Sequence, residues 1–308
     1  MRYKMKFTSF IFICGWYLVL TLFSSSEFIS LDSQLIVAGI FIFSVGIPHG
    51  AIDHIIFFEE NRAVSTFQFY FFYFSLMAGY VLAWLVLPLW SFIFFLLVSA
   101  FHFGQSQFSD IQSVSKMSLR VSNLTWGLSV LSSLIYYRAN ELSILFSQYS
   151  DLEILQIALN ENFHSILLAV SSLLFFMALC YWLWEKAISA QRFFMEIFLL
   201  GLIHLSFFTL PVIIGFTLYF STLHSARVLV EEFNYLKKRK RVFSFQKFVW
   251  MLLPYSFLSI IGGGLLLLLS YWDWISVSSI LLGLILISII TLPHSIVMDG
   301  FYGKMNKS

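Results

Sequence analysis

The chain has 308 residues, of which 59% are hydrophobic, 19% aromatic and only 11% charged, and its formal net charge at pH 7 is +2. A soluble globular domain carries about 25% charged residues, so this composition excludes an ordinary soluble domain. The near-neutral charge also gives no basic surface of the kind that binds nucleic acid.

Apolar runs of the length needed to cross the hydrocarbon core recur along the whole chain. They cover residues 7–24, 34–57, 68–87, 90–108, 118–137, 163–184, 193–210, 212–231, 248–270 and 275–298. The first run is too long for the apolar part of a signal peptide, and no small-residue cleavage site follows it, so we interpret it as a membrane helix. With no internal repeat in the chain, the sequence predicts one all-α domain over residues 1–308, an integral membrane bundle of about ten helices.

Two segments between the runs are polar. Residues 139–162 contain four acidic residues, with Leu and Ile at helical spacing, which is typical of an amphipathic segment that lies on the membrane surface. Residues 233–247 contain the basic run from Lys237 to Arg241. We interpret that segment as a cytoplasmic loop that orients the protein and contacts anionic lipid.

The basic residues test the helix count. With ten helices and both termini in the cytoplasm, 17 of the 18 Lys and Arg residues fall on the cytoplasmic side, and only Arg138 falls outside. Cytoplasmic loops of membrane proteins carry such an excess of basic residues. Omitting one helix would destroy the pattern, so count and orientation support each other, and we expect a multi-pass protein of the cell membrane.

This topology separates the seven histidines by their expected depth in the membrane. Four of them lie in even-numbered runs, which all cross in the same direction, and each stands roughly five to eight residues before the cytoplasmic end: His49, His102, His224 and His294. They are therefore expected at one depth. His164 and His204 lie towards the outer side, and we interpret both as structural.

A shared depth favours a metal site. A single histidine in a membrane helix more often bonds to a neighbouring helix. Four at one depth are better explained by a metal, because neutral imidazole is a common ligand of Fe, Cu and Zn and a metal satisfies all four at once. We predict that His49, His102, His224 and His294 bind it.

Residues near the four histidines are candidates for supporting roles. Asp53, four residues after His49, is expected to orient an imidazole, and His54 and Gln105 are further candidates for the layer around the ligands. Gly46, Pro48 and Gly50 are expected to kink the helix that carries His49. Four phenylalanines are candidates for an apolar substrate channel: Phe43, Phe101, Phe103 and Phe220.

At these residues the sequence resembles the Brp/Blh family of membrane β-carotene 15,15′-dioxygenases. The motifs are GIPHGAID at 46–53, SAFHFG at 99–104, HSAR at 224–227 and LPH at 292–294. The resemblance implies a non-haem Fe²⁺ enzyme that cleaves the central double bond of β-carotene with O₂ to two retinals, often for a rhodopsin. It also assigns a role beside the ligands to Arg227, which we expect either to snorkel or to pair with Asp53 or Glu231.

One position departs from the family pattern, in which the third motif has a second histidine four residues after the first. Here that position is Val228. Either His294 completes the site or the activity is altered. The alternatives are another metal-dependent carotenoid or lipid oxidase, and a non-enzymatic transporter or cofactor-binding membrane protein. The histidine clusters of desaturases, the HExxH motif and the paired repeats of transporters are all missing from the sequence.

Overall fold

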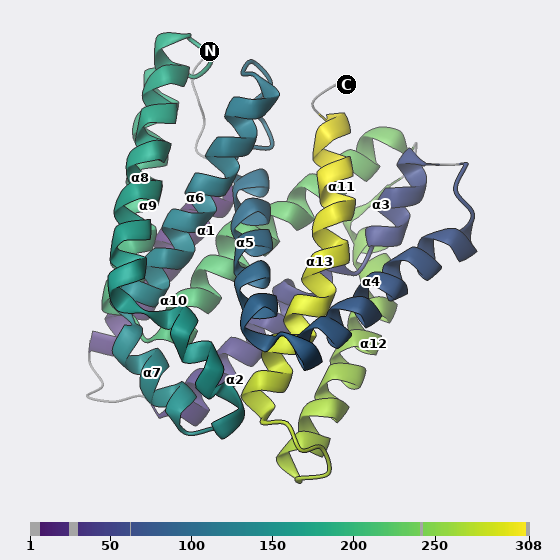
Figure 1. Ribbon diagram of the computed structural model, residues 1–308. Helices are drawn as coiled ribbons and strands as arrows, with labels where there is room; N and C mark the ends of the chain where they lie inside the picture. The colour runs from purple at the N-terminus through teal and green to yellow at the C-terminus, as the bar shows by residue number, and fades with distance from the viewer. Residues whose placement is uncertain (1–6, 25–29, 62, 241–242, 306–308) are drawn as a thin grey trace.

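The computed structural model describes residues 7–24, 30–61, 63–240 and 243–305. Every regular element in these ranges is a helix (Figure 1). Eight of the helical segments are long and apolar enough to cross a membrane. The prediction of a polytopic all-α membrane protein is confirmed.

The first part of the chain contains a composite helix that carries His49. After α1 (Phe7–Ser24), the chain forms α2 (Leu31–Phe41), a π-helical turn η1 (Ile42–Gly46), a 3₁₀ turn η2 (Ile47–Gly50) and α3 (Asp53–Glu60). The α-helical hydrogen bonding is therefore interrupted between Phe41 and Asp53. This agrees with the expectation that Pro48 and the glycines beside it distort the helix.

The middle of the chain forms longer helices joined by short turns. They are α4 (Thr66–Val86), α5 (Pro88–Gln107), α6 (Lys116–Tyr137), α7 (Ala139–Ser147), the 3₁₀ helix η3 (Ser150–Leu159), α8 (Glu161–Trp184) and α9 (Ala190–Thr209). Pro88 begins α5, where its missing N–H costs no helical hydrogen bond. Ser65 begins α4 with a capping box to Gln68.

The last part contains a second composite helix and the two longest helices. The composite consists of α10 (Val212–Leu218), the π-helical η4 (Tyr219–Ser225) and α11 (Ala226–Arg239). It is followed by α12 (Phe245–Tyr271) and α13 (Ser279–Met305), which have Pro254 and Pro293 in their interiors. His224 thus lies in a π-helical stretch, whereas His49 lies in a 3₁₀ turn.

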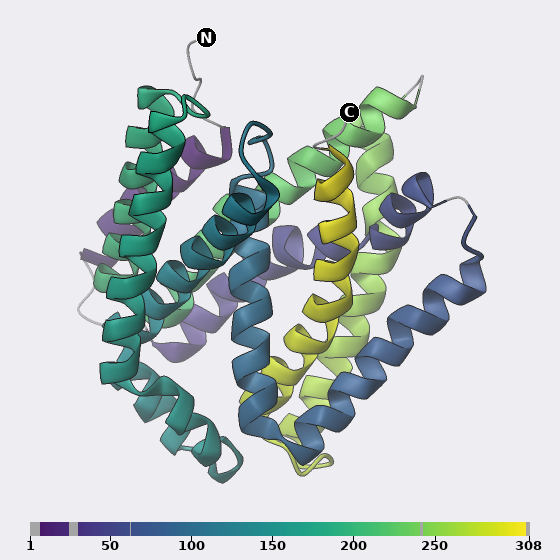
Figure 2. The same ribbon diagram turned by 45° about the horizontal axis from the view of Figure 1, so that its top comes forward.

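The helix ends divide between two ends of the molecule. The turn between α8 and α9, the loop between α5 and α6 and the C-terminal end of α13 lie together at the top of Figure 1, and the turned view in Figure 2 keeps them there. The α7 helix and the turn between α12 and α13 lie at the opposite end. This is the alternation that the basic residues predict, and which end faces the cytoplasm stays a prediction.

Two of the ten predicted spans are not among the eight. In α1 the apolar stretch whose side chains the structure describes runs from Ser9 to Val19, and α6 is rich in serine. In α6 the side chains of Ser122, Ser129 and Ser133 are fully buried, because this helix packs along both α5 and α8. Its polar residues therefore face protein rather than lipid, which lowers its hydropathy without placing polar groups in the hydrocarbon.

The two polar segments are more ordered than loops. Residues 139–162 form α7 and η3, whose Phe146, Leu152 and Leu155 are buried in a core shared with α5 and α13. The prediction of a loop over residues 233–247 was wrong for the first half of that range, because α11 continues to Arg239. Buried Glu232 and Leu236 keep this stretch packed on the bundle, and the cations in its last turn interact favourably with the helix dipole.

The α5 and α6 helices approach each other unusually closely. A Cβ atom on Gly104 would lie 2.0 Å from the carbonyl oxygen of Asn123, and one on Gly127 would lie 1.8 Å from that of Ala100. Each glycine thus lets the backbone of the facing helix fit against it. This contact fixes the position of α5 along α6, and α5 carries His102.

Candidate metal centre

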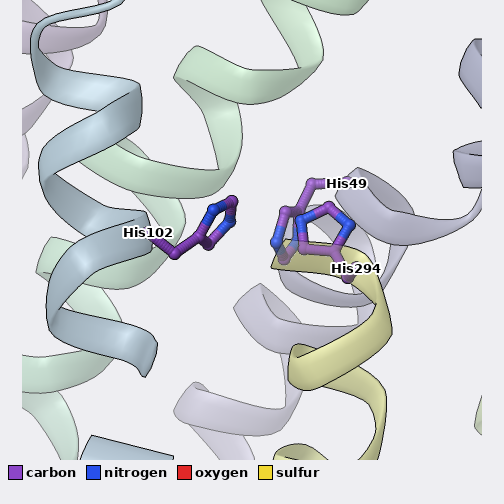
Figure 3. Close-up of side chains that lie close together, drawn as sticks. All are labelled: His49, His102 and His294. Atoms are coloured by element: carbon purple, nitrogen blue, oxygen red, sulfur yellow. The ribbon is translucent and has the colours of Figure 1, made fainter. Parts of the chain in front are cut away.

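Three histidines from three helical segments meet in the interior of the bundle. His49 lies on η2, His102 on α5 and His294 on α13, and all three are buried. One ring nitrogen from each lies within 4.8 Å of one from each of the others. Figure 3 shows His102 pointing from α5 towards the other two. Donor atoms at this spacing, from neutral rings on separate helices, can bind one metal ion.

The fourth predicted ligand, His224, packs against this cluster. Its ring centroid lies 5.2 Å from that of His49 and 4.8 Å from that of His102, and its side chain is buried. The depth argument from the sequence thus selected four rings that the structure places together. Three of them have nitrogens grouped closely enough for a common ion, and His224 borders the group.

Hydrogen bonds fix the orientation of three of the rings. His49 donates from Nδ1 to the carbonyl oxygen of Gly46, and His294 donates from Nδ1 to Oδ1 of Asp53 at 2.7 Å. Both acceptors lack a proton to give, so Nδ1 carries the hydrogen in each ring. In His224, Nδ1 lies 3.0 Å from the hydroxyl of Ser106. The Nδ1 atom of each ring is thereby engaged with protein.

The remaining ring nitrogens fit a metal ion. Among the described residues, Nε2 of His224, Nε2 of His294 and both ring nitrogens of His102 are buried and have no hydrogen-bond partner. A buried polar atom without a partner costs about 1–3 kcal/mol. Several such atoms in one small volume are costly together, and a metal bound by these nitrogens would remove the cost.

The irregular helices bring these side chains together. His49 follows the π-helical turn η1, and His224 lies in the π-helical η4. The π and 3₁₀ turns change the number of residues per turn, and they therefore re-aim the side chains that follow. On α13, Pro293 directly precedes His294 and removes one helical hydrogen bond there.

The expected supporting residues divide into two groups. Asp53 contacts the site through His294, and Gln105 lies beside the cluster on α5, where its amide donates to Asp299 at 2.6 Å. His54 points elsewhere, with its ring 4.4 Å from that of Tyr255.

Arg227 has other partners than those expected. It does not pair with Asp53 or Glu231 in any contact seen in the described residues. It donates instead to the backbone and side-chain oxygens of Gln107, and to the hydroxyl of Ser9 at 3.4 Å. In the first turn of α11, Arg227 thus bonds to residues of α5 and α1, while its neighbour Val228 packs against α3.

Two of the four channel phenylalanines lie beside the histidines. The ring of Phe103 lies 4.7 Å from that of His224, and Phe220 stacks on His224 at 5.5 Å and lies 6.3 Å from Phe103. Phe101 is half-buried, and Phe43 is 46% exposed on the outer surface of the bundle. The structure thus brings Phe103 and Phe220 to the cluster and leaves Phe43 outside it.

The histidines interpreted as structural are bonded away from the cluster. His164 bonds to the carbonyl oxygen of Ala158 at 2.8 Å, and His204 lies 3.1 Å from the hydroxyl of Ser129. Val228 is fully buried in an apolar core with Ile52 and Ile56. It fills space beside the helix that carries His49 and Asp53.

Two residues that bond to the site were missed from the sequence. Ser106 follows His102 by four residues, so helical spacing alone could have placed it on the same face. Tyr73, which bonds to Asp53 at 3.0 Å, gave no signal, since it lies in a run of Phe and Tyr residues on α4.

The same residues are covered by similarity to known proteins. The family model for β-carotene 15,15′-dioxygenase matches residues 40–302, a range that contains all four clustered histidines. A β-carotene 15,15′-dioxygenase from an uncultured marine bacterium, 66A03, is 28% identical over 264 residues, which cover 84% of this chain and 90% of that protein. No solved structure matches the chain. The match covers most of the chain and includes every π-helical and 3₁₀ turn beside the cluster, so the chain belongs to the β-carotene 15,15′-dioxygenase family.

Proposed function

We propose that this protein is a membrane non-haem iron dioxygenase that cleaves the central 15,15′ double bond of β-carotene with O₂. In this reaction the carbon–carbon double bond breaks, each of its carbons takes one oxygen atom, and two molecules of retinal form. The observation that carries the proposal is the buried group of His49, His102 and His294, in a chain of this family.

The histidines would bind Fe²⁺ through their unengaged nitrogens. Bound there, Fe²⁺ would supply open coordination positions and electrons for the activation of O₂. Uncharged imidazole ligands suit a site inside a membrane, because each anionic ligand would add a charge that is costly to bury. Asp53 holds the ring of His294 in one tautomer, and Ser106 contacts the ring of His224.

The apolar surroundings suit a carotenoid. Phe103 and Phe220 both lie against the ring of His224, and such aromatic faces position a conjugated chain without polar contacts. β-Carotene partitions into the bilayer, so we propose that it enters from the side, between helices. The exposed Phe43 would lie at that outer surface. The burial of the histidines excludes water from the place where the double bond would lie.

The eight apolar helices suit a multi-pass protein, and we place it in the cell membrane. Retinal released into the bilayer would be available to a retinal-binding rhodopsin in the same membrane.

The test is expression of the full chain in bacteria that accumulate β-carotene. We expect the cells to lose their colour and to form retinal, detected by chromatography, and the purified protein to contain about one iron per chain, measured by elemental analysis. His102→Ala should abolish both retinal and iron, because it removes a ring with two unengaged nitrogens.

His204→Ala is the matched control, since His204 is also a largely buried histidine in a membrane helix but bonds only to Ser129. It should retain iron and activity. Full activity in His102→Ala would contradict the metal assignment. Iron without retinal would contradict the proposed reaction and would favour another oxidase or a cofactor-binding protein.

A further inference from the structure

A chain of two hydrogen bonds connects three helices behind the histidine cluster. Tyr73 on α4 donates its hydroxyl proton to Oδ2 of Asp53 on α3, at 3.0 Å. The other carboxylate oxygen of Asp53, Oδ1, accepts from Nδ1 of His294 on α13, at 2.7 Å. Asp53 and His294 are each only 3% exposed. Both oxygens of the buried carboxylate are thus used, one by the imidazole and one by the phenol.

The carboxylate depends on Tyr73 for its orientation. A carboxylate bonded through one oxygen can turn about its last side-chain bond, whereas one held through both oxygens cannot turn without losing a bond. A buried carboxylate oxygen without a partner is also costly. The hydroxyl of Tyr73 removes this cost and fixes the plane in which Asp53 faces His294.

The ring of Tyr73 is itself held in place. It contacts Phe69, with ring centroids 5.6 Å apart, and Phe74, with centroids 6.3 Å apart. Phe69 belongs to the apolar core that also contains Ile52, the residue before Asp53. The hydroxyl is therefore fixed relative to α3, and it reaches the cluster through Asp53.

From this geometry we infer that Tyr73 is a positioning residue for the metal site. Through Asp53, it keeps the proton of His294 on Nδ1 and the ring turned so that Nε2 faces His49 and His102. The inference rests on the proposed metal site, and it assigns to an aromatic residue outside the histidine motifs a share of the metal affinity. Groups that orient a ligand in this way typically change metal affinity or activity by about 10–100-fold.

The chain offers a close control in Tyr80. This tyrosine lies on the same helix, seven residues after Tyr73, and it also donates a hydrogen bond, to the carbonyl oxygen of Ser91 at 2.7 Å. It packs in the core with Trp84 and Phe92, and none of its contacts reaches a histidine of the cluster. Both tyrosines can be changed to phenylalanine with the loss of one hydroxyl.

The experiment uses the purified full chain, stripped of metal, and Co²⁺ as a spectroscopic probe. We expect the wild-type protein to bind Co²⁺ with the absorption of a nitrogen-ligated ion. Tyr73→Phe should weaken the affinity for Co²⁺ about 10–100-fold and change that absorption, and Tyr80→Phe should leave both unchanged. Thermal unfolding of the metal-free variants shows whether the two substitutions change the stability of the fold by the same amount.

The outcomes separate this inference from the proposed reaction. Equal Co²⁺ affinity and spectrum in Tyr73→Phe and wild type would overturn the role of Tyr73, as would an equal loss in Tyr80→Phe. A wild-type protein that binds no Co²⁺ would overturn both the inference and the metal site. A wild-type protein that binds Co²⁺ but forms no retinal when loaded with Fe²⁺ would contradict the reaction alone, and the Tyr73 comparison would still decide the inference.

Discussion

At the scale of single residues, two glycines between α5 and α6 matter as much as the histidines, because glycine has no Cβ atom. Gly104 lies two residues after His102, and a Cβ atom there would lie 2.0 Å from the carbonyl oxygen of Asn123. A main-chain atom cannot rotate out of the way as a side chain can. The close contact between α5 and α6 therefore depends on glycine at this position and at Gly127.

Gly104→Ala is expected to push α5 away from α6 and to lower stability by about 1–3 kcal/mol or more, as overpacking does in other interiors. Because His102 is on the same helix, the affinity for metal should fall as well. Gly79→Ala is the control: a Cβ atom on Gly79 would meet nothing within 4 Å, and alanine favours the helix by about 0.5–1 kcal/mol. Thermal unfolding in detergent measures both, and an unchanged Gly104→Ala protein would contradict the account.

Several residue roles could be predicted from the sequence and others could not. The basic residues gave the direction of each helix, and the directions showed that His49, His102, His224 and His294 lie at one depth. The structure places these four rings together. The partners of Arg227 could not be predicted, since they depend on how α11 is rotated after the π-helical stretch. The hydrogen bond from Tyr73 to Asp53 depends on how α4 packs against α3, and the spacing of residues in the sequence does not indicate that packing.

At the scale of elements, the two composite helices are the irregular parts of an otherwise regular bundle. Each contains a π-helical stretch, at Ile42–Gly46 and Tyr219–Ser225, and each carries a histidine of the cluster in or just after it. The π-helix is rare, and it occurs frequently at functional sites. The sequence indicated a distorted helix around Pro48 but gave no sign of one around His224, where neither proline nor glycine is adjacent.

Deletion of Ser221 tests the function of η4. Removal of one residue from a π-helical stretch allows α-helical hydrogen bonding to continue through it, and one residue of an α-helix corresponds to a rotation of about 100°. His224 and α11 should then be misaligned with α10. We expect the affinity for Co²⁺ to fall at least about tenfold while the helix content measured by circular dichroism stays the same.

Ser221→Ala keeps the register and removes only the hydroxyl, which bonds to the carbonyl oxygen of Thr217. It should bind Co²⁺ as the wild type does. If the deletion variant bound the ion as tightly as Ser221→Ala, the π-helical stretch would not be needed for the site.

At the scale of the whole molecule, the distribution of charge and the arrangement of helix ends agree. The turn between α8 and α9, which contains Lys186, and the end of α13 that carries Lys304 lie at one end of the bundle, and α7 lies at the other (Figure 1). Lys240, at the end of α11, forms an ion pair with Glu59 at the end of α3, at 3.4 Å.

Reporter fusions at two sites test the orientation. Green fluorescent protein fused after Lys240 should fluoresce, and alkaline phosphatase fused near Asp151 should be active, because that enzyme requires the disulfides that form outside the cytoplasm. When the two reporters are exchanged between these sites, both should be inactive. The same reporter active at both sites would contradict the alternation of helices, and the reverse result would invert the orientation of the protein.

The residues of the cluster are far apart along the chain, and this has a consequence for how the protein is made. Translation delivers His49 and His102 before the other histidines of the cluster, and His294 follows 192 residues after His102. A nascent chain inserted up to α12 therefore has an incomplete set of imidazoles, and insertion of α13 both closes the bundle and finishes the donor set. With the proposed metal site, metal binding would report on complete assembly, since a chain that stalls or is cut before α13 would lack His294.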